Sequence, residues 1–215
     1  NFLRPIKNDN LIRLGDNIDG GYIVDSEIIK KIDTLITFGL GDGSNTENLQ
    51  WAFERDLLKL NNNIKIFVYD HTVGLMNYFR VIFKYLRRFL TFRCKFIDLK
   101  KRLNFLKEYL LFVNSSNVNL YQEKICANIT SKKEANIKKV LERLKHENKN
   151  IVLKCDIEGS EYEIINDIIF HESKFDMLIF EFHWIDKKKN EFINFVKKIL
   201  NNFFIIHIHA NNHND

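Results

Sequence analysis

The chain has 215 residues, with 33 Lys and Arg against 28 Asp and Glu, 45% hydrophobic residues, one Pro and three Cys. These values are typical of a globular chain with one sizeable core, and they exclude collagen-like, disordered and disulfide-framework proteins. Three widely spaced cysteines without a CxxC or zinc-ligand pattern favour a reduced, cytosolic setting. No run approaches the ~20 apolar residues of a membrane span, and the first residues do not read as a secretory signal.

The net charge of +5 is unevenly distributed along the chain. Residues 80–107 contain ten Lys or Arg and one acidic residue, Asp98, so this segment carries +9 and the rest of the chain −4. One interpretation is an ordinary solvated helix face. The other is a basic surface for an anionic substrate or an anionic membrane.

Apolar, β-branched runs alternate with segments of helical period, which is typical of βαβ units and a mainly parallel sheet. Strands are expected at 34–39, 64–70, 120–127, 151–157, 175–183 and 203–210. Helices are expected at 44–60, 73–90, 99–113, 132–147, 160–170 and 186–201. No repeat, low-complexity linker or Pro/Gly-rich hinge divides the sequence, so we expect a single α/β domain over 1–215.

Glycines follow the first long strand in the sequence ITFGLGDGSNTE (36–47). Gly39 and Gly41 would permit a tight turn and close approach of a ligand to the backbone, although an ordinary glycine turn would look the same. The next strand ends in Asp70, at the spacing where a carboxylate typically holds ribose hydroxyls. Together they indicate an adenosine-type cofactor, while the absence of GxGxxG argues against NAD.

Three charged residues alternate in KCDIEGSEYEII (154–165): Lys154, Asp156 and Glu158. If the strand continues through them, they share one face and reach the carboxyl edge of the sheet, where open α/β sheets bind ligands. The alternative is a solvated strand end followed by a turn at Gly159.

Polar residues end two further expected strands. Glu181 and His183 share a face of one strand, and His209 lies near the end of the other. In a parallel sheet these residues would gather with Asp156 at one edge. The group could be a general base with its orienting partners, or a carboxylate and imidazole site for a divalent metal made of Asp156, Glu181, His183 and His209.

An Asp-Gly-Gly-Tyr stretch precedes the glycine-rich strand, at Asp19 to Tyr22. Two adjacent glycines followed by an aromatic residue suit a tight turn that places a ring over a ligand, and they equally suit a plain hairpin turn.

Taken together, these stretches resemble the FkbM-type family of S-adenosylmethionine-dependent methyltransferases, in the family's order and over nearly the whole chain. The matching stretches are RLGDNIDGGYIV (13–24), ITFGLGDGSNTE (36–47), IFVYDHT (66–72), LKCDIEGSEYEII (153–165), LIFEFH (178–183) and HIHANN (207–212). The resemblance implies a Rossmann-like class I methyltransferase fold with a doubly wound sheet, and methylation of an oxygen, commonly a sugar hydroxyl in polysaccharide synthesis.

The same resemblance implies roles for individual residues. Gly39, Gly41 and the loop to Glu47 would cradle the methionine part of S-adenosylmethionine, and Asp70 would take the ribose. Asp19, Gly21, Tyr22 and Asp156 would help to close the cofactor site. The sequence departs from the family in two respects: it offers only the first strand of the usual final hairpin, and a long basic helical insertion, about 73–118, joins the second and third strands.

We therefore expect an O-methyltransferase in the cytosol or at the inner face of the membrane, with Asp156, Glu158 and His183 as base or acceptor-orienting residues. The basic insertion would bind an anionic acceptor such as a nucleotide-diphosphate sugar, or attach the protein peripherally to an anionic membrane. No nucleic-acid partner is expected. The alternatives are a non-catalytic nucleotide-fold protein recruited through its basic helices and an NAD-dependent sugar-modifying enzyme, the latter disfavoured by the glycine pattern.

Overall fold

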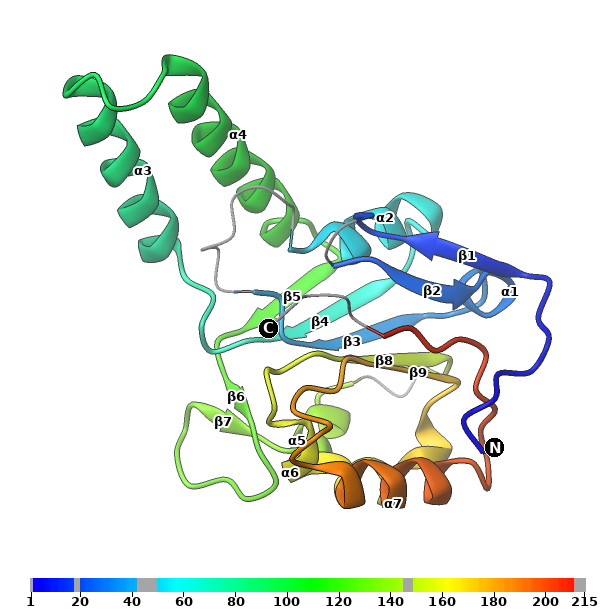
Figure 1. Ribbon diagram of the computed structural model, residues 1–215. Helices are drawn as coiled ribbons and strands as arrows, with labels where there is room; N and C mark the ends of the chain where they lie inside the picture. Colours follow the sequence, from blue (N-terminus) through cyan, green and yellow to red (C-terminus); the bar gives the residue numbers. More distant parts are fainter. Residues whose placement is uncertain (1, 18–19, 42–49, 145–148, 211–215) are drawn as a thin grey trace.

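A computed structural model of the protein describes residues 2–17, 20–41, 50–144 and 149–210. Its centre is a five-stranded, all-parallel sheet in the order β5-β4-β3-β8-β9 (Figure 1). The strands are β3 (Thr34–Phe38), β4 (Lys65–Tyr69), β5 (Val118–Tyr121), β8 (Ile151–Cys155) and β9 (Met177–Phe180). The chain is therefore an α/β protein, as the alternating sequence pattern predicts.

The two middle strands of the sheet are covered on both faces. Every residue of β3 and β8 is buried, which explains why their sequences are nearly continuous apolar runs rather than alternating ones. Successive side chains still point to opposite faces: Leu35 and Val152 belong to one apolar core, and Ile36 and Leu153 to the other.

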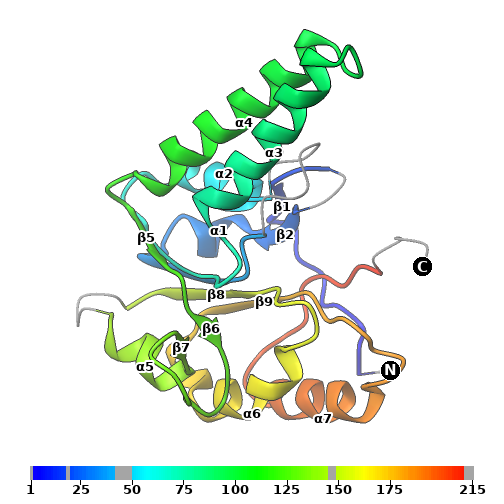
Figure 2. The same ribbon diagram turned by 90° about the vertical axis from the view of Figure 1, so that its left-hand side faces the viewer.

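Helices cover the two faces of the sheet in two layers (Figure 2). One layer contains α1 (Ser26–Ile29), α2 (Ala52–Leu60) and the bases of α3 (Leu75–Leu90) and α4 (Phe96–Val113). The other contains α5 (Ile137–Glu142), α6 (Glu161–Phe170) and α7 (Lys189–Ile199).

Smaller elements complete the fold. The antiparallel pair of β1 (Leu11–Leu14) and β2 (Tyr22–Asp25) lies over α2, and β2 begins at Tyr22, directly after the Gly-Gly pair. Two short strands, β6 (Lys124–Ile125) and β7 (Glu134–Ala135), pair in parallel, and a single 3₁₀ turn, η1 (Glu172–Lys174), leads to β9.

The expected strands at 34–39, 64–70, 151–157 and 175–183 are confirmed, each with slightly shorter bounds. The expected strand at 120–127 is divided into β5 and β6. Residues 145–147 of the expected helix at 132–147 lie outside the described residues, and its described part contains β7 followed by α5. Part of the expected helix at 44–60 lies outside the described residues; its remainder is α2.

The expected strand at 203–210 is wrong, because this segment forms no strand. Its backbone carbonyl at Ile205 accepts a hydrogen bond from the amide of Ile6 at 2.9 Å instead of continuing the ladder of β9. Phe203 and Ile205 pack against one core, so the apolar pattern reflects burial of side chains without sheet pairing.

Two long helices between β4 and β5 form a hairpin that stands away from the body of the protein (Figures 1 and 2). We call α3, α4 and the connecting residues 91–95 the helical hairpin. Its base is anchored by aromatic contacts of Trp51 with Tyr78 and Tyr109. None of the described helices is long and apolar enough to cross a membrane.

Candidate functional site

The strand order places a topological switch point between β3 and β8, where the sheet's crossovers diverge to opposite sides. In open α/β sheets, ligands bind outside the carboxyl ends of the strands at this point. Backbone hydrogen bonds continue the ladders just beyond the strands: the amides of Gly39, Asp156 and Glu181 donate to the carbonyls of Tyr69, Phe38 and Cys155 at 3.1, 2.9 and 2.9 Å. The predicted site residues therefore follow their strands side by side at one edge.

A cavity of about 450 Å³ opens at this edge. Among the described residues its lining contains five carboxylates and one lysine: Asp70, Glu123, Asp156, Glu158, Glu181 and Lys124. The volume lies in the usual range of small-molecule pockets, roughly 300–1,000 Å³. Glu123 is ion-paired with Arg143 and Lys139, and the other four carboxylates favour a ligand that carries positive charge over one that carries a pyrophosphate.

The glycine segment after β3 forms one wall of the cavity. Gly39 has a φ of 81°, and a Cβ placed on it would lie 1.7 Å from the backbone oxygen of Asp156. Glycine is therefore required here for close approach of the β3 and β8 ends. The predicted contributions of Glu47 and Asp19 fall on residues outside those described.

Asp70 is buried and fully engaged by the protein. One carboxylate oxygen accepts the amides of Leu40 and Gly41 at 2.8 and 3.1 Å. The other accepts the amide and hydroxyl of Thr72 at 2.7 and 2.6 Å and the amide of Val73 at 3.3 Å. A carboxylate offers about four acceptor positions, so in this arrangement Asp70 ties the glycine segment to the end of β4. Ribose binding by Asp70 stays a prediction.

Tyr22 links the amino-terminal hairpin to the strand ends. Its hydroxyl lies 2.9 Å from Asp156 and 3.2 Å from Glu181, within hydrogen-bonding reach of both carboxylates. Burial, followed by the charges of Asp156 and Glu181, raises the pKa of Tyr22 well above 10, so the phenol keeps its proton. Glycine is required at position 21, just before Tyr22, because a Cβ there would lie 1.9 Å from the carbonyl oxygen of Asp16.

Lys154 points away from the cavity entrance into the core beneath it. Its ammonium lies 3.0 Å from Glu54, and the two side chains are only 2% and 0% exposed. The hydroxyl of Thr37 donates to the same carboxylate at 2.9 Å. Burial alone would lower the pKa of Lys154, but the charges of Glu54 and Asp156 outweigh it and raise that pKa. Lys154 is therefore a buried structural cation.

Of the three alternating charged residues only Lys154 lies on β8, which ends at Cys155, so the expected strand through Asp156 and Glu158 is wrong. The side chain of Glu158 is 86% exposed, and its φ is 54°, in the left-handed region that non-glycine residues seldom occupy. Trp184, next to His183, has the same φ, and a Cβ on Gly159 would lie 2.7 Å from the Trp184 ring. The Trp184 ring thus lies against Gly159, and the strained residue Glu158 lines the cavity, as is common at functional sites.

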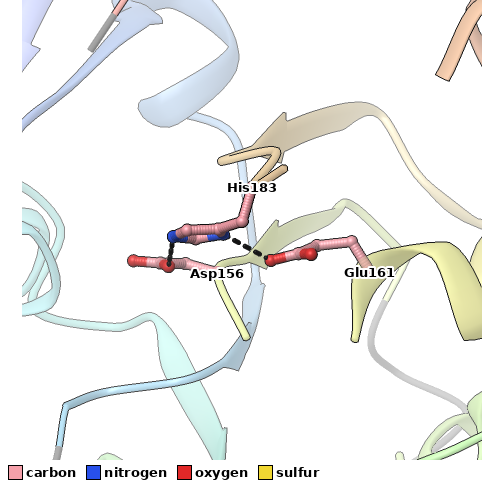
Figure 3. A group of neighbouring side chains, drawn as sticks. All are labelled: Asp156, Glu161 and His183. Carbon is pink, nitrogen blue, oxygen red and sulfur yellow. Dashed lines mark hydrogen bonds and ion pairs between the residues drawn. The ribbon is translucent and has the colours of Figure 1, made fainter. Parts of the chain in front are cut away.

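His183 joins the carboxylates of this edge (Figure 3). Its Nδ1 lies 2.9 Å from Glu161, and its Nε2 lies 3.5 Å from Glu158 and 4.0 Å from Asp156. The hydroxyl of Tyr162 donates to the carbonyl of His183 at 2.8 Å, which fixes the backbone. The hydrogen bond to Glu161, opposed by burial, raises the pKa of His183 to about 9, so the ring is an imidazolium at neutral pH.

Glu161 is the site residue that the sequence prediction missed. It opens α6, its side chain is 0% exposed, and the carboxylate oxygen that meets His183 also accepts the amide of Ile157 at 3.1 Å. The signal was present in the KCDIEGSEYEII stretch. A glutamate in the first turn of a helix, however, normally predicts a surface residue that stabilises the helix dipole.

Three ligand atoms of Asp156, Glu161 and His183 lie within 4.8 Å of one another, as metal ligands would. Glu181 and His209, which the predicted metal site includes, are outside that group, and His209 lies exposed on the segment that forms no strand. The imidazole and two carboxylates are a donor set that divalent ions accept. The bonds from His183 and Ile157 both end on Oε1 of Glu161, and Oε2 is buried without a hydrogen-bond partner among the described residues.

Comparison with protein-family models, curated proteins and solved structures finds no match to this chain. The fold and the site alone therefore define its class: an α/β protein with a five-stranded parallel sheet, flanked by helices and compatible with a Rossmann-like fold. A carboxylate-rich cavity lies at the switch point of the sheet.

Proposed function

We propose that the protein is an S-adenosylmethionine-dependent O-methyltransferase that acts on a hydroxyl of a sugar. The observation that supports it most is the cavity at the switch point, whose lining has five carboxylates and one lysine. The resemblance of the sequence to FkbM-type methyltransferases supports the same activity.

The lining fits S-adenosylmethionine in size and in charge. The cofactor carries a sulfonium and an ammonium group, which carboxylates stabilise, whereas the pyrophosphate of NAD would face the same carboxylates at an energetic cost. Asp156, Tyr22, Gly39 and Gly41 are the residues that would hold the cofactor. When bound, S-adenosylmethionine supplies an activated methyl group on a positively charged sulfur.

His183, Asp156 and Glu158 have different roles toward the acceptor hydroxyl. Because His183 holds its proton at neutral pH, it acts as a fixed positive charge that orients the carboxylates rather than as the base. Asp156 lines the cavity and is held by the Tyr22 hydroxyl, so it is the candidate base. Glu158, exposed at the mouth, orients the acceptor.

The acceptor class rests on the resemblance: a nucleotide-linked sugar or a precursor of a surface polysaccharide. Glu158, whose φ is positive, lines the cavity and is exposed, so an acceptor would meet it on entry. A cytosolic location, at or near the inner face of the membrane, would suit that acceptor.

Transfer of label from radioactive S-adenosylmethionine to a panel of nucleotide sugars tests this function. We expect a labelled sugar product from the wild type and at least about a hundredfold less from Asp156→Asn. Asp9→Asn, an exposed carboxylate far from the strand ends in sequence, is the matched control and should keep full activity. Cofactor binding without transfer to any acceptor would instead indicate the non-catalytic alternative, a nucleotide-fold binding protein.

A further inference from the structure

The helical hairpin carries the basic segment of the chain away from the central sheet (Figures 1 and 2). It begins close to the cavity, since Thr72 lines that cavity and α3 starts at Leu75. The 16 residues of α3, at about 1.5 Å each, place the tip about 24 Å from the base. Most of the hairpin therefore projects beyond the reach of a small acceptor in the cavity.

The two helices of the hairpin pack on each other through one side of each. Tyr78 stacks on Tyr109 with ring centroids 4.3 Å apart, Arg102 donates to the hydroxyl of Tyr85 at 3.0 Å, and Phe89 meets Phe96 at 5.8 Å. These contacts fix which sectors of α3 and α4 face each other. The sectors next to them are left without cover by the other helix.

An apolar stripe runs along the uncovered part of α3. Its residues recur at spacings of three and four, and each is exposed: Met76, Phe79, Phe83, Leu86 and Leu90. This spacing places all five on one side of the helix. At the tip, Phe92 is 98% exposed. An uncovered apolar surface of this kind marks an interaction site rather than an ordinary solvated face.

The neighbouring sector of α4 continues this surface. Phe96, Leu103 and Leu111 are exposed, and a shallow groove of about 430 Å³ runs along Leu103, Leu106 and Leu110. The two helices of the hairpin run antiparallel. In such a pair, residues about 100° further around each helix axis than its contact side lie on the same side of the hairpin. The stripe of α3 and this sector of α4 therefore form one surface, which we call the apolar face.

Basic residues border the apolar face. Residues 75–113 contain ten Lys or Arg against Asp98 and Glu108, a net charge of +8. On α3, Arg80, Lys84 and Arg87 lie on the sector next to the stripe, and no ion pair between described residues neutralises them. An apolar stripe with lysine and arginine beside it is the pattern of helices that lie in the interface of an anionic bilayer.

We propose that the helical hairpin docks on an anionic lipid surface, with the apolar face in the boundary between headgroups and acyl chains and with Phe92 at the leading end. A second copy of the chain is a poorer occupant, because two hairpins of charge +8 would repel each other. A nucleic acid would leave the apolar face in water. The docking goes beyond the proposed function and does not depend on it.

Co-sedimentation of the full chain with lipid vesicles tests the docking. We expect binding to phosphatidylcholine vesicles that contain about 30 mol% phosphatidylglycerol at about 0.15 M salt, and little binding to pure phosphatidylcholine. Raising the salt to about 1 M should weaken binding at least about tenfold. Equal binding to neutral and anionic vesicles, or no binding to either, would overturn the proposal.

Two variants separate the contributions of the hairpin. Phe83→Ser with Leu90→Ser and Phe92→Ser should lower vesicle affinity at least about tenfold, and Arg80→Gln with Lys84→Gln and Arg87→Gln should lower it about fivefold for each charge removed. The matched controls replace exposed residues outside the hairpin, Phe170→Ser with Phe204→Ser, and Lys132→Gln with Lys133→Gln. Circular dichroism and the unfolding midpoint establish that each variant is folded.

Three results would contradict the docking. The apolar variant could bind vesicles as the wild type does. The mass in solution could show a dimer that only the apolar variant dissociates, which would assign the face to a second copy. The basic variant could raise the Michaelis constant for a nucleotide sugar and leave vesicle binding unchanged, which would assign the charge to the acceptor.

Discussion

Replacement of Glu161 by Gln tests the electrostatic organisation of the site most closely. Glutamine keeps the shape of the side chain and an oxygen to accept the amide of Ile157, but it removes the negative charge 2.9 Å from Nδ1 of His183. Because the hydrogen bond to Glu161 is the main cause of the raised pKa of His183, about 9, we expect that pKa to fall to about 7 or below in the variant.

The raised pKa of His183 also contributes to the free energy of unfolding. A difference between about 9 and the ordinary 6.5 corresponds to about 3 kcal/mol at about 1.4 kcal/mol per pH unit. Solvent reaches the ring, whose side chain is 21% exposed, which reduces the effect to about 2 kcal/mol. Because the folded-state pKa is raised, this stabilisation is complete below about pH 6.5 and is lost as the pH rises from there to about 9.

The pKa is measured by following the imidazole resonances of the seven histidines by NMR, with His183→Asn to assign the signal. Urea unfolding at pH 6 and pH 10 then gives the free energy of unfolding of wild type and variant. The wild type should lose about 2 kcal/mol more than Glu161→Gln over this interval. Glu163→Gln, an exposed residue two positions along α6, should behave as the wild type. A wild-type pKa near 6.5, or one that Glu161→Gln does not move, would refute the reasoning.

Three further predictions concern the core, the glycine segment and metal. Lys154→Met leaves the carboxylate of Glu54 buried and unpaired, so urea unfolding should show a loss of about 3–5 kcal/mol, most of it recovered when Glu54→Leu is added; a loss below about 1 kcal/mol would contradict the pairing. Gly39→Ala should cost at least about 2 kcal/mol of unfolding free energy, whereas Gly74→Ala, whose Cβ has its nearest neighbour at 3.9 Å, should be nearly neutral; equal effects would refute the argument from close approach. Methyl transfer should persist in the presence of a chelator, and loss of transfer that a divalent ion restores would assign Asp156 and its neighbours to a metal.

The parallel sheet was predictable because its central strands leave a local signal. A run such as that of β8 (Ile151–Cys155) is apolar except for Lys154 and is bounded by turn residues, which is typical of a strand covered on both sides. Since parallel strands end at one edge, the gathering of Asp156, Glu181 and His183 there followed from the same pattern.

The expected strand at 203–210, which the structure contradicts, was wrong for a reason that local sequence patterns cannot show. The segment 203–210 has the apolar content of a strand, but a strand also needs a partner in register, and Ile205 pairs with Ile6 instead of with β9. Sequence periodicity contains no information on such long-range pairing. The local pattern likewise does not reveal the backbone amides that donate to Asp70, and ribose binding by this residue stays a prediction.

Glu161 was missed for a similar reason. Whether a glutamate in the first turn of a helix faces solvent or the core depends on how α6 packs on the sheet, and only that packing brings it within 2.9 Å of His183, which lies 22 positions away in the sequence. The basic segment shows the opposite case. Its charge and apolar spacing are visible in the sequence, and the structure adds that the stripe of α3 is uncovered.

The central claim, that the carboxylate-lined cavity holds S-adenosylmethionine, is tested most directly by calorimetric titration of the purified protein with that cofactor. The account predicts saturable binding by the wild type, a loss of affinity of about tenfold or more in Asp156→Asn with Asp9→Asn unchanged, and no binding of NADH. Binding of NADH but not of S-adenosylmethionine, or equal cofactor affinity in the wild type and in a folded Asp156→Asn variant, would contradict it.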